Sequence, residues 1–393
     1  TMSSYSNQSG FPVLRAQVRC QGNRGQITVS QRPYRWAVMP ARESEQRWTL
    51  PVCVAFGGER SERRTECTWL SERTASMAVA GCPRWVFPLA GASAYAVAEG
   101  DALAAVDVAE LSSREHAALV HSAWAAIEEG RAPRAAFSLL ADALGSDDQH
   151  LLELTLDIVV ELLENTRGQL RKRLIAAVGE PLIRRAMAVG FRKLPTGDYA
   201  GRTARARMVR VAAVDLGHRP LMEEAERIAG EALAGRPGGD RGAIIAALET
   251  FAAGLEPQVA ELMVRELRGE RRMEVIRDRV GTLASITRQD TAARVLELLH
   301  GESGGQLFLP LVLSSYSSQR GSAAAALRFL RAHPEYLENL GDVVAVRARF
   351  SAGLCSQADA KLLERVVPVV GDDDAGSTIR ACAGRAALLR RLR

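Results

Sequence analysis

The fold is decided near the start of the chain by residues 9–34, SGFPVLRAQVRCQGNRGQITVSQRPY. In the second half of this stretch apolar and polar side chains alternate: Ile27 and Val29 face one way, Gln26 and Thr28 the other. A glycine-containing turn separates this segment from the preceding FPVLRAQV. The stretch therefore predicts a β-hairpin at the beginning of a chain that is otherwise mostly helical.

Further short apolar segments follow up to about residue 100, among them WTLPVCVAF, ECTWL, SMAVA and RWVFPLA. Short strands at this spacing predict an antiparallel β-sandwich of about seven strands. We assign it to an N-terminal domain, residues 1–103. Its small core is expected to depend on four tryptophans, Trp36, Trp48, Trp69 and Trp85.

The pattern changes to helix near residue 110. Ser112 or Ser113 is the expected N-cap of the first long helix, with Glu115 in its first turn. Gly130 is expected to end that helix. Its apolar face is predicted to comprise Leu119, Val120, Ala123, Trp124 and Ile127.

Amphipathic segments separated by Gly, Pro or Asp continue to the end of the chain without a strict sequence period. Many short helices bury their apolar faces best by stacking on their neighbours. Residues 108–393 are therefore predicted to form a HEAT/armadillo-like α-superhelix. The expected fold class is mostly α, with a small all-β N-terminal domain.

Composition is that of a globular protein, with 393 residues, 47% hydrophobic, 25% charged and a net charge of +5. Only three basic residues are lysines, so 51 minus 3, or 48, are arginines. This bias indicates a GC-rich, bacterial genome. The sequence contains no run of about 18 apolar residues, so no membrane span is predicted. The sequence does not identify the cellular compartment.

The six cysteines form no Cys-x-x-Cys pair, which argues against a structural zinc site. Cys53 and Cys67 lie on strands expected to pair, so a cross-strand disulfide is sterically feasible. The favoured expectation is that the cysteines are reduced, buried thiols.

Catalytic and metal-binding motifs are absent from the sequence. No two of the six histidines have the helical spacing of paired zinc ligands, and neither His-Glu-x-x-His nor a phosphate-binding loop occurs. The acidic loops 238–242 and 371–376 are expected to be solvated turns rather than cation sites. We therefore expect no catalytic residue, no metal ligand and no stoichiometric zinc in this chain.

Residues 167–210 carry twelve basic and two acidic residues, a net charge of +10. A solvated helical face is the simpler explanation. The functional alternative is attraction of an anionic partner, either a peptide carboxylate or an acidic protein surface. Arg171, Arg184 and Arg205 are candidates for binding a peptide's C-terminal carboxylate, chosen on charge alone. Nucleic acid is disfavoured because only Phe191 and Tyr199 could stack on bases.

Several phrases, taken in order, resemble the zinc aminopeptidases of the aminopeptidase N type. SNQSGFPVLRAQV, ITVSQRPY and RWTLPVCVAFGG resemble strands that follow the catalytic domain of that family. CPRWVFPLAGASAYAVA resembles the family's next strand and turn, and LSSREHAALVHSAWAAIEEGRAP its first C-terminal helix. The segments 350–367 and 377–393 resemble the closing helices.

The resemblance implies the C-terminal portion of such an enzyme, without the catalytic domain. It further implies a β-sandwich and a helical superhelix that cap the active site and limit peptide access, with zinc held in the preceding catalytic domain. Tyr95 matches one tyrosine of the family's turn, but Ala96 and Val97 depart from it, and Leu89 replaces an asparagine.

Two functions from different classes follow. The first is a non-catalytic region of a zinc metallo-aminopeptidase, a hydrolase, that acts on peptide substrates together with its catalytic domain. The alternative is a stand-alone helical-repeat scaffold for protein–protein interaction, without enzymatic activity. Nucleic-acid binding ranks third.

Overall fold

The structure is a computed structural model. It describes residues 3–8, 10–35, 46–58, 61–99, 106–131, 135–195, 197–302, 305–369 and 375–391. The chain divides into two compact units, Thr1–Val178 with Arg391–Arg393, and Gly179–Arg390. The predicted domain boundary at residues 103–108 lies partly outside the described residues and stays a prediction.

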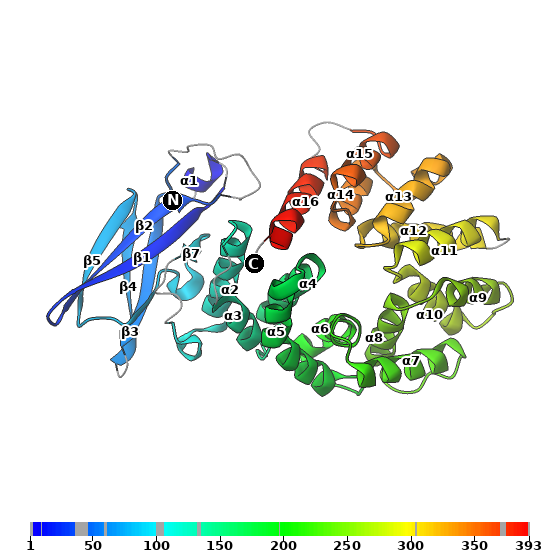
Figure 1. Cartoon of the computed structure of the whole chain (residues 1–393), viewed down its shortest axis with the longest axis horizontal. Coiled ribbons are helices and arrows are strands. Elements are labelled where there is room, and N and C mark those ends of the chain that lie inside the picture. The colour runs from blue at the N-terminus through cyan, green and yellow to red at the C-terminus, as the bar shows by residue number, and fades with distance from the viewer. Residues whose placement is uncertain are drawn as a thin grey trace. The chain divides into compact units, whose positions relative to one another are not determined.

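The first unit opens with a small β-region (Figure 1). Its strands are β1 (Pro12–Gln21), β2 (Arg24–Pro33), β3 (Leu50–Gly58), β4 (Ser61–Leu70), β5 (Thr74–Ala80), β6 (Trp85–Phe87) and β7 (Val97–Glu99). They form a four-stranded sheet in the order β5-β2-β1-β7 and a three-stranded sheet in the order β4-β3-β6. The prediction of a small N-terminal β-region is thus confirmed.

The predicted hairpin is β1 and β2, paired antiparallel from Pro12 opposite Pro33 to Gln21 opposite Arg24. A two-residue loop joins the strands, and Gly22 within it has a φ of +56°, a conformation that favours glycine. Ile27 and Val29 are fully buried, as the alternation predicts.

The expectation of a purely antiparallel arrangement is wrong at one edge. Strand β7 lies parallel to β1, with Val13 opposite Val97 and Arg15 opposite Glu99. The two strands are far apart in sequence, so the chain reaches this edge by a long connection rather than by a hairpin.

Both sheets contribute to one hydrophobic core. Leu14 and Ile27 come from the first sheet, and Val52 and Val86 from the second. Trp48 and Trp85 are buried here as predicted, whereas Trp36 lies outside the described residues.

Trp69 is 60% exposed, so its predicted core role is wrong. It lies on β4 directly before the fully buried Leu70. Successive side chains of a strand point to opposite faces, which turns the ring of Trp69 away from the core.

All six cysteines are paired, so the expectation of reduced thiols is wrong. Cys53 and Cys67 face each other across β3 and β4. The remaining pairs are Cys20–Cys82 and Cys355–Cys382, whose partners are 62 and 27 residues apart in sequence. Sequence spacing gives no sign of these two longer-range bridges.

The helical segments of the first unit follow the capping signals of the sequence. They are α1 (Ser3–Ser6), η1 (Ala90–Ala92), η3 (Val108–Glu110), α2 (Ser113–Glu128), α3 (Ala135–Ala143), α4 (Gln149–Asn165) and the first part of α5 (Gly168–Val189). Ser112 caps α2 in a reciprocal capping box with Glu115. Four of the five predicted apolar-face residues are buried, with Trp124 partly exposed.

The second unit is helical. Its elements are the rest of α5, α6 (Tyr199–Arg210), η4 (Val211–Asp215), α7 (Arg219–Leu233), α8 (Arg241–Ala253), α9 (Pro257–Leu267), α10 (Met273–Ala284), α11 (Gln289–Gly301), η5 (Gly305–Leu307), α12 (Leu309–Ser318), α13 (Ala323–Ala332), η6 (Pro334–Tyr336), η7 (Glu338–Leu340), α14 (Val343–Gly353), α15 (Gln357–Val366) and α16 (Ala375–Arg391).

Helices of the second unit pack on the helix two places further along the chain. One row runs α6, α8, α10, α12 and α14, and another runs α9, α11, α13 and α15. A continuous hydrophobic core extends from Ala252 to Ile379. Each helix therefore buries its apolar face against sequence neighbours, as expected for stacked helices.

Within the part of the chain that the structure describes, no helix combines the length and apolar character that a membrane crossing requires.

Each disulfide of the β-region should raise the free energy of unfolding, and the bridge that closes the longer loop should raise it more. The pairs close loops of 62 and 14 residues. We expect C20A/C82A to lower the free energy of unfolding by about 4 kcal/mol and C53A/C67A by about 3 kcal/mol. Denaturant titration of the purified variants, with thiol counting on the parent, measures both. Six free thiols in the folded, unreduced parent would contradict the bridges.

Glu115 should make the stability of the first unit depend on pH. Burial favours the neutral acid, but hydrogen bonds from Arg63, the Gly91 and Ser112 amides and the Ser112 hydroxyl lower its pKa from 4.5 to about 2. Between about pH 4.5 and pH 2 the Glu115 carboxyl is therefore protonated in the unfolded chain but still ionised in the folded chain. The free energy of unfolding consequently falls as pH is lowered from about 4.5 to about 2.

Chemical denaturation at several pH values measures this effect. E115Q should lose about 3 kcal/mol at pH 7, because Arg63 loses its charged partner, and should show a flatter acid dependence than the parent. E110Q, a change at an exposed glutamate of the preceding turn, is the matched control. Equal acid dependence in parent and E115Q would refute the assignment.

Candidate functional site

The basic segment 167–210 begins with Arg167, directly before α5, and continues through α5, the following loop and α6. Seven of its twelve basic side chains are exposed, namely Arg167, Lys172, Arg173, Arg184, Arg192, Lys193 and Arg202. Much of the positive charge is therefore accessible to solvent.

Arg171 and Arg184 make local contacts. Arg171 belongs to the first unit, where Nη1 donates to the Leu163 carbonyl. Arg184 belongs to the second unit and pairs with Glu180 one helical turn earlier, and its side chain is 73% exposed. An exposed pair of this kind opens at little cost, so Arg184 is available to a ligand.

Arg205 differs from both because only 3% of its side chain is exposed. Nη1 donates to Oδ2 of Asp240 over 2.6 Å, and Nη2 donates to the Arg192 carbonyl over 3.0 Å. Asp240 also caps α8 by accepting from the Ala243 amide, and hydrogen bonding to Arg205 lowers the pKa of the Asp240 carboxyl. These bonds join α6, α8 and the loop before α6.

The same contacts explain the acidic loop 238–242. Asp240 is a helix cap and an ion-pair partner there, with no sign of a cation-binding role. The second acidic loop, 371–376, includes Asp372, Asp373 and Asp374, which lie outside the described residues.

The second unit has a shallow cavity of about 360 Å³ where α5 ends and α7 begins. It is lined by Met187, Gly190, Phe191, Arg192, His218, Pro220, Leu221 and Glu224. Its walls are mostly apolar, and they include Met187, a residue that is 50% exposed. Opposite charges are contributed by Arg192 and Glu224.

The local backbone geometry positions His218 in the lining of this cavity. Helix α6 continues into a single π-helical segment, Val211–Asp215, and Gly217 follows with a φ of +68°. The His218 amide then donates to the Ala212 carbonyl over 2.9 Å. Segments with π-helical geometry occur often at binding sites.

The charged residues of the cavity are held by neighbours on their own segments. Nη2 of Arg192 donates to the Met187 carbonyl over 3.0 Å. Arg227 donates two hydrogen bonds to Glu224, which lowers the pKa of that carboxyl. The cavity can thus present an apolar surface between a cation and an anion, a combination suited to a peptide residue.

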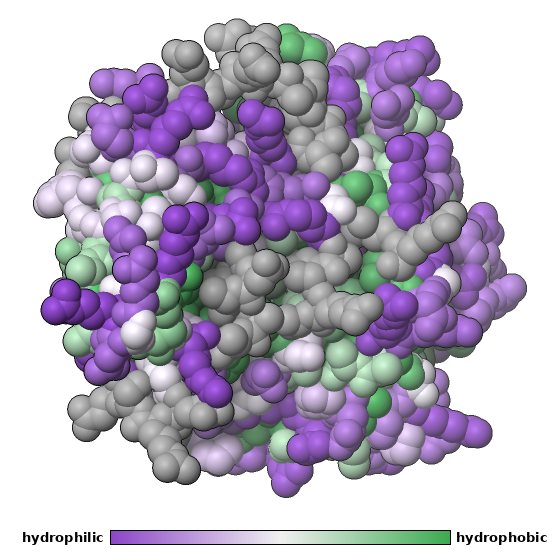
Figure 2. All heavy atoms as spheres, turned by 60° about the vertical axis from the view of Figure 1, so that its left-hand side comes forward, coloured by the Kyte–Doolittle hydropathy of each residue, from purple (hydrophilic) through white to green (hydrophobic). Residues whose placement is uncertain are grey.

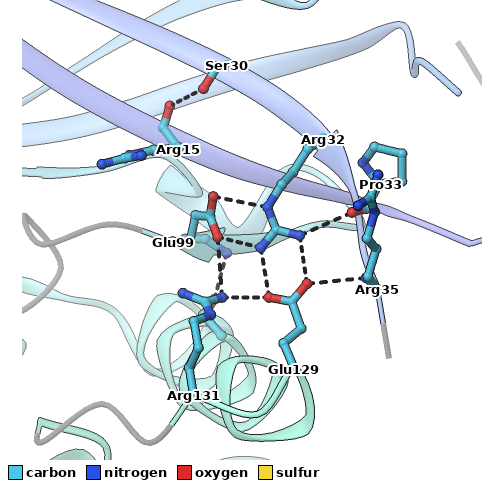
Figure 3. Close-up of polar contacts among 10 residues, drawn as sticks. Arg15, Ser30, Arg32, Pro33, Arg35, Glu99, Glu129 and Arg131 are labelled. Atoms are coloured by element: carbon cyan, nitrogen blue, oxygen red, sulfur yellow. Dashed lines mark hydrogen bonds and ion pairs between the residues drawn. The ribbon is translucent and has the colours of Figure 1, made fainter. Parts of the chain in front are cut away.

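A separate polar network lies in the first unit, at the junction of strands and helices (Figure 3). Nη1 of Arg32, on β2, donates to Glu129 at the end of α2 over 2.6 Å, and its guanidinium also pairs with Glu99 on β7. Arg131 bonds to both glutamates. Burial alone would raise the pKa of Glu129, but Arg32 and Arg131 lower it.

The neighbouring Gln31 and Tyr34 also have structural roles. The Gln31 amide donates to the carbonyls of Trp48 and Glu72 and accepts from the Trp48 amide, all within 2.9 Å. The Tyr34 hydroxyl donates to Glu128 over 2.8 Å. The motif SQRPY therefore contributes contacts that hold the β-region together and to α2.

Within the part of the chain that the structure describes, side chains of the types that can bind a metal ion gather at one place, in the second unit. His300, His333 and Glu335 each offer a donor atom, and these atoms lie within 4.8 Å of one another. Sequence spacing missed the group because 33 residues separate the two histidines. The short signals were Glu297-x-x-His300 and His333-x-Glu335, which are too common to be diagnostic.

Among the described residues on the face drawn in Figure 2, hydrophilic side chains predominate over hydrophobic ones.

Comparison with known proteins connects the chain to an aminopeptidase over part of its length. It is 26% identical over 161 residues to the puromycin-sensitive aminopeptidase of Caenorhabditis elegans. The match covers 38% of this chain and 17% of that enzyme. No family model matches the chain.

The burial of Arg205 and the exposure of Arg184 lead to opposite expectations for charge reversal. R205E should lower the free energy of unfolding by about 3–5 kcal/mol, because it leaves Asp240 facing a like charge. R184E should change it by less than about 0.5 kcal/mol. Urea titrations of the two purified variants measure the difference. Equal destabilisation would contradict the placement of these side chains.

Proposed function

We propose that this chain is a non-catalytic region of a protein related to zinc aminopeptidases, and that it controls peptide access to an active site elsewhere in that protein. The observation that carries the proposal is the partial similarity to a puromycin-sensitive aminopeptidase. The chain spans less than a fifth of that relative, so the activity of the whole protein belongs to the proposal.

The absence of His-Glu-x-x-His from the sequence supports a role without bond cleavage. In this proposal the zinc that cleaves peptides belongs to a preceding catalytic domain. The present chain contributes a helical wall that limits which peptides pass and charged side chains that attract them.

Alternate packing of the helices supports the proposed HEAT/armadillo-like superhelix. A stack in which each helix contacts the second-next helix can extend by adding pairs. Such a wall can restrict which peptides pass and can carry side chains that contact them.

Peptide contact is proposed for the cavity beside Phe191, with Arg192 as the cation in its lining. Arg171, Arg184 and Arg205 remain candidates for attracting the peptide carboxylate. Arg184 is the best suited because it is exposed, whereas Arg205 already serves Asp240.

We further propose that the chain matures in an oxidising compartment. All six cysteines are in disulfides, and such bridges persist in secreted or periplasmic proteins but are rare in the reducing cytosol.

The second candidate function is a scaffold that binds another protein. Val259 and Leu262, on α9, are 41% and 54% exposed, and their spacing of three residues places them on one helix face. In this second proposal the apolar pair would form part of the contact with the partner protein.

Two assays on the purified chain test the first proposal. It should hydrolyse no aminoacyl p-nitroanilide, and it should bind a mixture of fluorescent peptides of about ten residues. F191A and R192E should each weaken binding about fivefold, because they remove the apolar wall and the cation of the cavity. K361E, at an exposed lysine on α15, is the control and should leave binding unchanged.

Hydrolysis that a chelator abolishes would overturn the non-catalytic role. Failure of the parent chain to bind any peptide would instead favour the scaffold.

A further inference from the structure

A group of possible metal ligands joins two helical segments in the second unit. His300 lies in the last turn of α11, His333 directly follows α13, and Glu335 belongs to η6. One donor atom of each lies within 4.8 Å of the others. The two imidazole rings are 4.1 Å apart between centroids.

The remaining ring nitrogens have partners of the kind seen around metal-bound histidines. Nδ1 of His300 lies within hydrogen-bond distance of the Tyr336 hydroxyl, at 3.0 Å, whereas Nε2 of His333 faces the Glu297 carboxylate at 3.9 Å, beyond hydrogen-bond distance. Ligand histidines commonly direct their second nitrogen to such a group, which fixes the tautomer. This leaves Nε2 of His300 and Nδ1 of His333 to share an ion.

Glu335 completes the set. Its Oε1 lies 3.5 Å from Nδ1 of His333, and its side chain is 59% exposed. The donors of a tetrahedral zinc ion are roughly 3.3 Å apart, as follows from metal–ligand distances of about 2.0–2.1 Å. Oε1 of Glu335 and Nδ1 of His333 are already close to this separation. Small rotations of the His300 and Glu335 side chains would bring all three donors, which lie within 4.8 Å of one another, to it.

We propose that His300, His333 and Glu335 bind one Zn²⁺ ion, with water as the fourth ligand. Two imidazoles and a carboxylate suit a borderline divalent ion such as zinc better than Mg²⁺ or Ca²⁺, which prefer oxygen donors. This proposal replaces the sequence-based expectation of no metal ligand. It concerns a site separate from the peptide-cleaving zinc of the proposed function and does not depend on it.

The bound ion would connect the end of α11 to the segment after α13. His333 is 22% exposed, so the ion can enter from solvent. Its role is therefore that of a staple between two helical segments, and binding should raise thermal stability by mass action.

Equilibrium dialysis of the purified full chain against micromolar Zn²⁺, followed by metal analysis, tests the site. We expect one zinc per chain and a higher unfolding temperature. Co²⁺ should give the visible absorption of a tetrahedral site. H333A should abolish zinc binding, the rise in unfolding temperature and the Co²⁺ absorption. E335Q and Y336F should each weaken zinc binding by about tenfold.

H150A removes an exposed histidine on α4 and is the matched control, expected to retain the metal. E335Q changes an exposed side chain and so tests the site even if H333A folds poorly. Zinc bound only at millimolar concentration, or bound equally by the parent, H333A and E335Q, would overturn the proposal.

Discussion

Paired carboxylates and arginines at the two ends of α2 are the contacts on which the first unit depends. Glu115, at the start of the helix, accepts from Arg63 on β4 and from the Gly91 amide. Arg32 on β2 holds Glu129 at the other end. Because α3 and α4 both pack on α2, the two contacts fix where the helices begin relative to the strands. The carboxylates of Glu115 and Glu129 are only 1% and 8% exposed, so loss of its arginine partner leaves each of them as a costly unpaired ion.

Local signals in the sequence predicted the elements well. Alternation at Ile27 and Val29 identified the hairpin, and the capping residues Ser112 and Glu115 identified the start of α2. These features depend on a few adjacent residues. The parallel pairing of β7 with β1 depends on partners remote in sequence, which periodicity does not record. The outward turn of Trp69 follows from its alternation with the buried Leu70, so that error came from weighting residue type above the period of the strand.

In the candidate sites, too, features set by adjacent residues were predicted, whereas features set by residues remote in sequence were not. Charge counting found the basic segment but could not separate the exposed Arg184 from the buried Arg205, because burial depends on the position of Asp240 on another helix. The cavity beside Phe191 depends on the π-helical segment before His218, which no motif signals. His300 and His333 meet only because α11 packs on α13.

The order of the cysteines has a consequence for how the chain matures. Cys53 and Cys67 both lie between Cys20 and Cys82, so one bridge is nested inside the other. Oxidation in order of synthesis would join Cys20 to Cys53 and Cys67 to Cys82, which are incorrect pairs. The native pattern therefore requires either that the inner hairpin closes while Cys20 stays reduced, or that a shuffling enzyme exchanges mismatched bridges afterwards.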